Sequence, residues 1–218
     1  MKKVVVFGTS KLSELMYYYL THDDRYELSA FSVDDGYYNS DSFMGMPVIR
    51  SSELTSAYPP EEYSIVMTMG YSSMNELRKD KFWHFKSRGY EIETYCHPSS
   101  VILTDKIGEG CIILENCTVG AFCELGCSNI IYPSTTIAHH THIGDFNFFS
   151  VECAVAGDVN IKNNCFFGVN CTVRDSITVE DHTLVGAGAY ISKSTESYGV
   201  YTPAKTVKLD KKSTGIVI

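Results

Sequence analysis

Three histidines lie within four residues of this sequence. His139, His140 and His142 stand between Ile137 and Ile143. An imidazole has an ordinary pKa near 6.5, so it can accept a proton at neutral pH and suits general-base catalysis. The alternative interpretation is three solvated side chains on a turn. As a cluster, the histidines favour a site of proton transfer.

The histidines belong to a six-residue repeat that must position them. Large apolar residues recur at every sixth position from Val101 to Ile191, without a change of phase. A helix would show a period near 3.6 and an ordinary strand a period of two. A hexapeptide repeat instead predicts a parallel β-helix, with three hexads per coil of 18 residues and about five coils in all.

The 18-residue coil predicts which residues lie next to the histidines. Gly157 comes one coil after His139, and its N–H could stabilise an oxyanion. The alternative is a glycine that only completes a turn. Glu124 lies one coil before His142 and Asp158 lies one coil after His140, so either carboxylate could orient an imidazole.

The 18-residue coil spacing also argues against a metal site. A zinc site needs three or four convergent ligands. His97 and His182 are 42 and 43 residues from His139, which is not a whole number of coils. No metal is therefore expected.

Eight cysteines are present, and the repeat accounts for most of them. Six occupy the small inward position of a hexad, where a thiol packs as a compact apolar group. These six are Cys111, Cys117, Cys123, Cys153, Cys165 and Cys171. The chain has no CxxC motif, and a free-thiol role stays open for Cys96 and Cys127.

Residues 1–97 show strand and helix patterns in alternation, which is typical of a parallel sheet of Rossmann type. Expected strands are 4–7, 27–33, 47–49 (at a sheet edge), 63–69 and 90–95, and expected helices are 12–20, 52–57 and 73–88. The apolar face of the last helix should contain Leu77, Phe82, Trp83 and Phe85. His97-Pro98 is the expected domain boundary, because a residue before proline is disfavoured in a helix.

The first expected turn could bind phosphate. Gly8, Thr9 and Ser10 lie between a strand and a helix, where backbone N–H groups favour anions. Asp34 and Asp35 end the second strand, where an acidic residue contacts ribose in such folds. Solvated turn carboxylates are the alternative. The complete G-x-G-x-x-G pattern is absent.

Composition limits the classes of partner. The chain has 218 residues, 44% of them apolar, and a net charge of −8 without a Lys/Arg cluster, so no nucleic acid is expected. The apolar run after Lys3 is too short for a signal peptide, and no stretch is long enough for a spanning helix. A soluble, cytoplasmic protein without membrane insertion is expected.

An α/β unit followed by an uninterrupted hexapeptide repeat resembles the sialic-acid O-acetyltransferase and bacillosamine N-acetyltransferase family over nearly the whole chain. The resemblance implies a left-handed β-helix, a homotrimer, and acetyl-CoA or another acyl-CoA in the groove between adjacent prisms. It also implies a nucleotide-activated sugar on the N-terminal domain, no metal, and a role in surface glycan synthesis.

The family's Ile-Glu-His-Asp motif corresponds to Ile137 through His140, so His139 matches the general base. Ala138 and His140 replace the motif's two carboxylates, which leaves open whether His139 or His140 is the base. Gly157 matches the oxyanion donor. By the same resemblance, Gly186, Ala187 and Gly188 line the CoA arm, and Gly8, Thr9, Ser10, Asp34, Asp35 and Gly70 hold the nucleotide sugar.

The expected organisation is therefore a Rossmann-like nucleotide-sugar domain (1–97), a β-helix acyltransferase domain (98–197) and a capping tail (198–218). The expected activity is acyl transfer to an amino or hydroxyl group of the sugar. Two alternatives remain at this point. One is a metal hydratase of the γ-carbonic-anhydrase type, and the other is a non-catalytic trimeric scaffold that binds a nucleotide.

Overall fold

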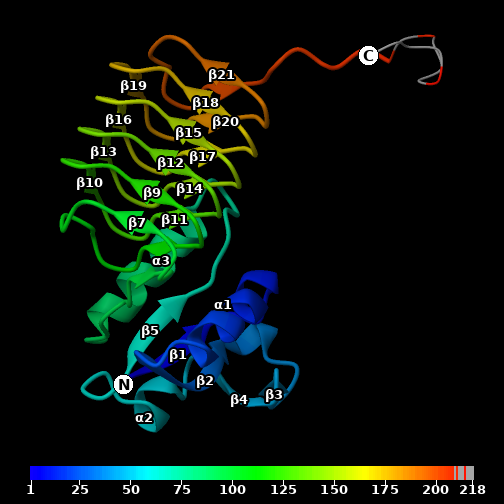
Figure 1. The fold of residues 1–218 in the computed structure, drawn as a ribbon. Helices are drawn as coiled ribbons and strands as arrows, with labels where there is room; N and C mark the ends of the chain where they lie inside the picture. The colour runs from blue at the N-terminus through cyan, green and yellow to red at the C-terminus, as the bar shows by residue number, and fades with distance from the viewer. Residues whose placement is uncertain (209, 211–213, 215–218) are drawn as a thin grey trace.

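The structure is a computed structural model that describes residues 1–208, 210 and 214. An N-terminal α/β unit is followed by a tall prism of stacked two-residue strands (Figure 1). Among the helices of these residues, none has the length and apolar character needed to cross a membrane.

The N-terminal sheet has the strand order β3-β4-β2-β1-β5. All its neighbours pair in parallel except β3, which is antiparallel to β4. The strand expected at a sheet edge, β4, is therefore the second strand from that edge, and β3 forms the edge itself. The strands are β1 (Lys2–Phe7), β2 (Tyr26–Val33), β3 (Ser42–Phe43), β4 (Met46–Arg50) and β5 (Ser64–Met67). The order reverses at β1, and ligands of α/β sheets bind at the carboxyl ends of strands at such a point.

Helices cover both faces of this sheet. Val4 and Val6 of β1 share an apolar cluster with α1, whereas Val5 and Phe7 share one with α2 and α3. A strand buried on both faces is apolar throughout, which explains the unbroken run of β1. The helices are α1 (Lys11–Thr21), α2 (Leu54–Ala57) and α3 (Glu76–Ser87), with a 3₁₀ turn at Asp35–Tyr37.

Helix α3 begins later than the sequence predicts. Ser73, Met74 and Asn75 adopt left-handed backbone angles, with φ of 52°, 50° and 68°, so they cannot continue a right-handed helix. Two of the four apolar residues expected on its buried face, Leu77 and Trp83, are exposed.

The strand predicted over residues 90–95 is also wrong. Only Ile92 forms an isolated bridge to the sheet, opposite Ile65. Tyr95 and Cys96 instead form β6, which pairs with β8 of the prism. The first strand of the prism thus precedes the predicted boundary at His97-Pro98, and the division into domains stays a prediction.

The prism has three faces of parallel strands. The seven-stranded face contains β6 (Tyr95–Cys96), β8 (Ile112–Ile113), β11 (Ile130–Ile131), β14 (Phe148–Phe149), β17 (Phe166–Phe167), β20 (Leu184–Val185) and β22 (Val200–Tyr201). The six-stranded face contains β7 (Val101–Ile102), β9 (Thr118–Val119), β12 (Thr136–Ile137), β15 (Ala154–Val155), β18 (Thr172–Val173) and β21 (Tyr190–Ile191). The four-stranded face contains β10 (Glu124–Leu125), β13 (His142–Ile143), β16 (Asn160–Ile161) and β19 (Thr178–Val179).

Turns between these strands form three corners of the prism. The His139 corner, between the six- and four-stranded faces, comprises turns 120–123, 138–141, 156–159 and 174–177. The Arg78 corner, packed by Arg78 of α3, comprises turns 126–129, 144–147, 162–165 and 180–183. The Gly186 corner comprises turns 114–117, 132–135, 150–153, 168–171 and 186–189.

The apolar residues of the six-residue repeat form the prism core as predicted, with one exception in the first coil. The six repeat cysteines are buried free thiols, and burial raises the pKa of Cys111 to about 12. At the first coil, however, Ile102 packs against the core and Val101 is 52% exposed. Ile102 pairs with Val119 at a spacing one residue short of a full coil, so the phase shifts there.

A left-handed residue makes each corner turn possible. One residue per hexad has a φ between 52° and 76° through most of the prism. These residues are Gly110, Asn116, Phe122, Ser128, Ser134, His140, Phe146, Glu152, Asp158, Asn164, Asn170, Ser176, His182 and Gly188. The turn therefore fixes the backbone of His140.

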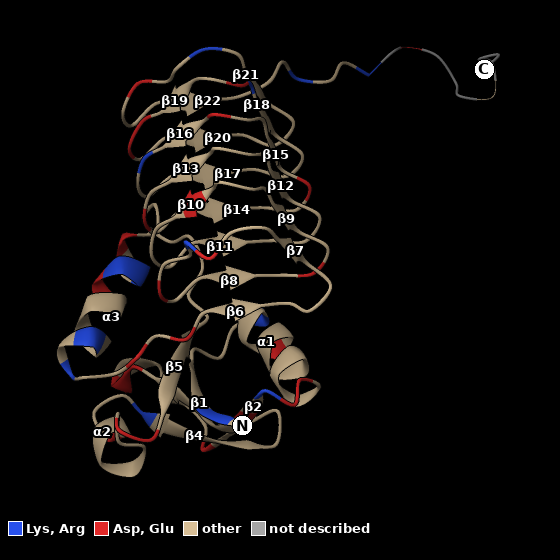
Figure 2. Cartoon of the chain, turned by 60° about the vertical axis from the view of Figure 1, so that its left-hand side comes forward, with Lys and Arg blue, Asp and Glu red and all other residues tan. Residues whose placement is uncertain are grey.

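The α/β unit packs on the outer side of the seven-stranded face, below and beside the prism (Figure 2). Ile112, Ile130 and Phe148 point outward from this face and join the apolar cluster of α1. At the far end, Val200–Tyr201 adds a last strand, but residues 202–208 are exposed and lead away from the prism (Figure 1). The rest of the predicted capping tail, apart from residues 210 and 214, lies outside the described residues, so the capping role of residues 198–218 stays a prediction.

Candidate functional site

His139 and His140 both occupy the corner turn that follows β12, and both side chains are exposed. The turn requires a left-handed residue, and His140 meets this requirement with a φ of 59°. Successive residues of a tight turn project differently, so the two imidazoles meet almost at right angles, with ring planes 85° apart.

The imidazole of His139 packs directly against Gly157 of the next coil, as the coil spacing predicts. A Cβ atom built on Gly157 would be 2.6 Å from Cε1 of His139 and 3.0 Å from Nε2. Only a glycine leaves room for the ring here. Among the described residues, no acceptor takes the N–H of Gly157, whereas the N–H of Asp158 donates to the carbonyl of His139 at 3.0 Å. The imidazole of His139 thus packs against a glycine whose N–H has no acceptor among the described residues.

His140 is the hydrogen-bond partner of His139. The two Nδ1 atoms are 3.0 Å apart, so one ring donates and the other accepts. The far side of His140 stacks on Phe122, with ring centroids 4.8 Å apart and planes inclined by 29°. Phe122, His140 and His139 therefore form a continuous row of rings.

The two candidate carboxylates have other partners. Glu124 lies 3.5 Å from Nδ1 of His142 and also pairs with Lys106, whose ammonium lowers the pKa of the Glu124 carboxyl. Asp158 accepts a hydrogen bond from Ser176 at 3.3 Å. Within the described residues, neither carboxylate is bonded to His139 or His140, so neither orients them.

A cavity of about 840 Å³ opens one coil below His139, on the side of the α/β unit. Phe122 and Leu103 give it an apolar wall, and Glu124, His142 and Lys106 give it a polar one. The base candidate therefore has a polar and aromatic cavity on one side and Gly157 on the other.

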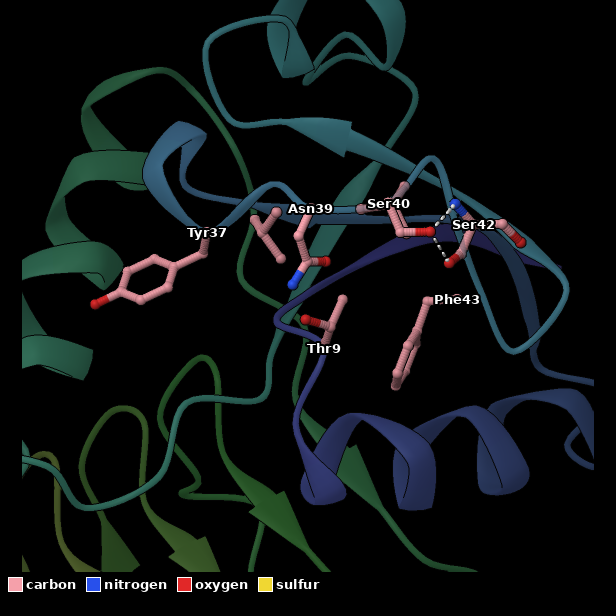
Figure 3. Close-up of a pocket in the computed structure, with 8 residues that line it drawn as sticks. Thr9, Tyr37, Asn39, Ser40, Ser42 and Phe43 are labelled. Carbon is pink, nitrogen blue, oxygen red and sulfur yellow. Dashed lines mark hydrogen bonds between the residues drawn. The ribbon is translucent and has the colours of Figure 1, made fainter.

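A second hollow lies at the carboxyl ends of β1 and β2. Gly8, Thr9, Ser10 and Asp34 line a cavity of about 270 Å³, together with Phe7, Val33, Tyr37 and Met69. Thr9 and Tyr37 also border an adjoining cavity of about 220 Å³, which Asn39 and Phe43 enclose from the other side (Figure 3). A Cβ on Gly8 would be 2.6 Å from Oγ1 of Thr68, so the turn needs glycine there.

Of the other residues predicted to bind the nucleotide sugar, one lines this cavity and two do not. Asp34 lines the cavity and pairs with Lys81 at 2.5 Å. Asp35 lies outside the lining, and hydrogen bonds from Ser52 lower the pKa of its carboxyl. Gly70 is not in the lining either, and its carbonyl accepts a hydrogen bond from Arg78.

Gly186, Ala187 and Gly188 lie at a different corner from His139 in the same chain. The N–H of Gly186 already donates to Tyr201 at 2.7 Å, and Gly188 has a φ of 70° that favours glycine. Within a single chain, these residues and Gly157 therefore lie at different corners of the prism.

No three metal-binding side chains converge within residues 1–208, 210 and 214. His97 contacts Ser99, and His182 contacts Glu76 at 2.8 Å. The scattered histidines therefore serve separate local contacts.

Several site residues were not anticipated from the sequence. Phe122 stands 18 residues before His140, so the coil spacing applied to His140 would have found it. Tyr37 and Met69 follow the ends of β2 and β5, where a parallel sheet gathers its ligands. Lys81 had no signal, because its pairing with Asp34 spans 47 residues.

Comparison with known proteins supports the fold. A family model for the hexapeptide repeat of succinyl-transferase matches residues 159–193. No curated protein sequence matches the chain. The acetyltransferase domain of PglB from Neisseria gonorrhoeae is 21% identical, with a TM-score of 0.82 over 95% of this chain and 100% of that one.

Two further structures are similar over nearly the whole chain. PerB from Caulobacter crescentus, in complex with CoA and GDP-perosamine, is 20% identical, with a TM-score of 0.82 over 93% of this chain and 95% of that one. WeeI from Acinetobacter baumannii is 20% identical, with a TM-score of 0.78 over 92% and 96%. At these identities the likeness establishes a hexapeptide-repeat fold, as the sequence resemblance predicted.

Proposed function

We propose that this protein is an acyl-CoA-dependent acyltransferase that modifies an amino or hydroxyl group of a nucleotide-linked sugar. The observation that carries the proposal is the contact of the His139 imidazole with Gly157, whose N–H has no acceptor among the described residues. Four similar structures support it. The PglB domain is solved with acetyl-CoA and PerB with CoA and GDP-perosamine, and two histidine mutants of the perosamine N-acetyltransferase from Caulobacter crescentus are solved with the same two ligands.

In the proposed reaction, the acceptor nitrogen or oxygen attacks the thioester carbonyl carbon of acetyl-CoA. Nε2 of His139 takes the proton from the acceptor, and the N–H of Gly157 donates to the oxyanion that forms. The carbon–sulfur bond then breaks. The CoA sulfur leaves with the proton returned by His139, and the acyl group stays on the sugar. No metal takes part in these steps.

The two sides of His139 suit the two substrates. The acyl carbonyl must lie near Gly157, one coil above, so we place acyl-CoA there. The cavity below His139 offers Phe122 for the apolar face of a sugar ring and polar groups for its hydroxyls. The acceptor sugar would therefore reach His139 from the end of the prism that contains the first coils.

The nucleotide part would bind at the cavity that contains Gly8, Thr9 and Ser10. These residues precede α1, whose first N–H groups and dipole favour a phosphate. Asp34, which follows β2 and lines the same cavity, would accept hydrogen bonds from ribose hydroxyls. The expected Rossmann-like role of this unit is part of the proposal.

A second copy of the chain would complete the site. The α/β unit covers the seven-stranded face, which lies opposite the His139 corner, and the Gly186 corner is separate again. A sugar held by one chain therefore suits His139 of another copy. We propose the homotrimer with a left-handed prism that the sequence resemblance implies, with Gly186, Ala187 and Gly188 of an adjacent copy lining the CoA arm.

Thiol release from acetyl-CoA across UDP-, dTDP-, GDP- and CMP-sugars tests the proposal. We expect one sugar class to be acylated, and His139→Ala to lower kcat by about 10²–10⁴-fold. His22→Ala, at the exposed end of α1, is the control and should keep wild-type turnover. Turnover of His139→Ala within a few-fold of wild type would refute the assignment of the base, and no transfer to any sugar would refute the activity.

A further inference from the structure

We infer that His140 is the positioning residue for the base, and that its Nδ1 lone pair accepts the Nδ1–H of His139. This inference rests on the proposed acyl transfer. It identifies what replaces a carboxylate beside the base in this chain, where Ala138 has no polar side-chain atom and both candidate carboxylates are bound elsewhere.

The geometry assigns the proton between the two rings. The Nδ1 atoms are 3.0 Å apart, and two neutral imidazoles can share this contact only when one Nδ1 is protonated and the other is not. Both ring nitrogens of His139 lie near Gly157, at 3.0 Å (Nε2) and 3.1 Å (Nδ1) from a Cβ built there. Because Nδ1 faces His140, Nε2 is the nitrogen left to take the substrate proton with its lone pair. His139 must therefore carry its proton on Nδ1, so His140 must accept at Nδ1 and be protonated at Nε2.

This tautomer matters because it is not the one that a free imidazole prefers. A histidine in water is mostly protonated at Nε2, and in that form Nε2 cannot take a proton from a substrate. An acceptor at Nδ1 selects the productive tautomer and fixes the ring plane, as an orienting group does for other catalytic histidines. When His139 becomes positively charged during the reaction, the same contact stabilises the imidazolium.

Two features hold His140 ready for this role. Its ring stacks on Phe122, and its N–H donates to the carbonyl of Ala121 at 3.1 Å. Its left-handed backbone is imposed by the corner turn, which recurs once per hexad on either side. The fold therefore orients His140 before any substrate binds.

Two variants test whether His140 acts as a hydrogen-bond acceptor or only fills space at this position. His140→Gly removes the ring and suits the φ of 59°, so the turn should be kept. His140→Asn also tolerates a left-handed backbone, and its side-chain oxygen can take the place of Nδ1. We expect the Gly variant to lose about 10²-fold in kcat with KM nearly unchanged, and the Asn variant to recover about 10-fold of that loss.

The kinetic outcomes are distinct. A Gly variant within a few-fold of wild type, or an Asn variant as slow as Gly, would overturn the acceptor role. If His140→Gly lost as much as His139→Ala without recovery in Asn, His140 itself would be the base and the inference would be wrong.

A spectroscopic test does not depend on activity. Nitrogen-15 NMR of the histidine rings at neutral pH should show His139 protonated at Nδ1 in the wild type, and protonated mainly at Nε2 in His140→Gly. A wild-type His139 protonated at Nε2 would refute the pairing. If no sugar nucleotide is acylated but His139 shows the Nδ1 tautomer, the proposed function fails and the pairing stands.

Discussion

At the scale of single residues, the space between Gly157 and His139 decides where the imidazole of the base can lie. A Cβ at this position would overlap Cε1 of His139 at 2.6 Å, a distance that demands movement of the ring or the backbone. The φ of Gly157 is outside the left-handed region, so alanine would meet no backbone strain there. The glycine is thus required for room and not for conformation.

Gly157→Ala should therefore displace the imidazole without unfolding the prism. Because a misplacement of about 1 Å can cost 10²-fold in rate, we expect kcat to fall by about that factor while the melting temperature stays within a few degrees. The control is the double variant with His139→Ala. Once the ring has gone, the added methyl has nothing to displace, so the two losses should not add. Additive losses would show that the methyl acts elsewhere.

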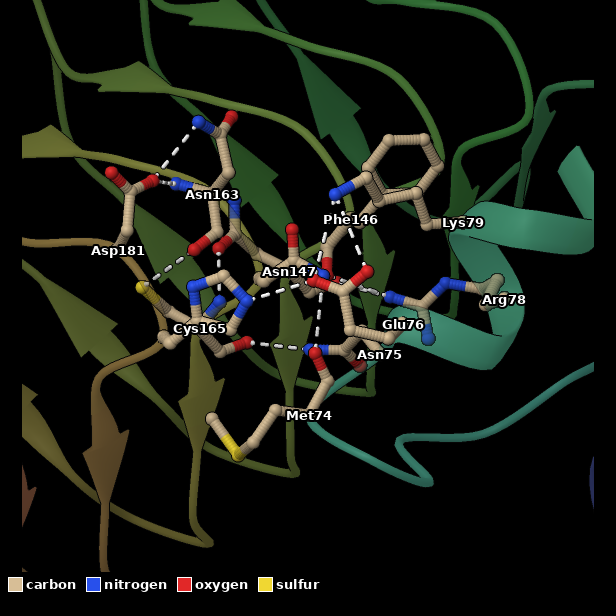
Figure 4. Close-up of polar contacts among 12 residues, drawn as sticks. Met74, Asn75, Glu76, Arg78, Lys79, Phe146, Asn147, Asn163, Cys165 and Asp181 are labelled. Carbon is tan, nitrogen blue, oxygen red and sulfur yellow. Dashed lines mark hydrogen bonds and ion pairs between the residues drawn. The ribbon is translucent and has the colours of Figure 1, made fainter. Parts of the chain in front are cut away.

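At the scale of elements, α3 is tied to the Arg78 corner by polar contacts. Arg78 is 1% exposed, and its guanidinium donates to the carbonyls of Phe146 and Asn147 (Figure 4). It also donates to the carbonyls of Ser128 and Gly70. These contacts join two successive coils to the loop before α3. Among the described residues, the partners of this buried cation are backbone carbonyls and not carboxylates.

The start of α3 continues these contacts up the same corner. Nδ2 of Asn75 donates to the carbonyl of Cys165 at 3.1 Å, and Glu76 pairs with His182 at 2.8 Å. The hydrogen bond with His182 lowers the pKa of the Glu76 carboxyl. A carboxyl with a depressed pKa adds stability above its ordinary value of 4.5, and this stability is lost as the pH falls through the lowered pKa.

Arg78→Met should loosen α3 from the prism. The change removes the donor from several buried carbonyls, at about 1–3 kcal/mol for each, and the apolar side chain of methionine offsets part of this by filling the space of the arginine stem. We expect a loss of about 3 kcal/mol in the free energy of unfolding, measured in denaturant through the fluorescence of Trp83, the sole tryptophan, which lies on α3. Arg88→Met is the matched control, because Arg88 ends the same helix and is exposed. Equal losses in both variants would contradict a special role for Arg78.

How far the sequence predicts these elements depends on the range of the contacts. The six-residue period is local, so it predicts the prism, the buried cysteines and the position of Gly157 over His139. It cannot choose between Val101 and Ile102, because both are apolar and the first coil is one residue short.

Contacts between segments that are far apart in the sequence could not be predicted. Arg78 looks like any charged residue of an exposed helix face, and its burial depends on turns 50 and 68 residues away. In the site, the coil spacing predicted that Glu124 lies next to His142. It could not show that the Glu124 carboxylate also forms an ion pair with Lys106. The pairing of His139 with His140 depends on side-chain torsions that the repeat does not fix.

At the scale of the whole molecule, the α/β unit and the prism share one apolar core. Ile112, Ile130 and Phe148 on the outer side of the seven-stranded face pack in the same cluster as Leu12 and Met16 of α1. Two domains joined only by a linker would not bury such residues against each other. The unit that would hold the nucleotide is therefore fixed to the prism, on the side opposite its own His139.

Two adjacent isoleucines test this shared core. Ile130 points outward into the cluster of α1 and Ile131 points inward into the prism, and both are fully buried. Replacing either by alanine removes the same atoms and should cost about 2–5 kcal/mol. We expect Ile130→Ala to speed amide hydrogen exchange in α1 and β1 with little change in β18 and β21. Ile131→Ala should instead speed exchange in the neighbouring coils. Unchanged exchange of α1 in Ile130→Ala would mean that the α/β unit folds independently of the prism.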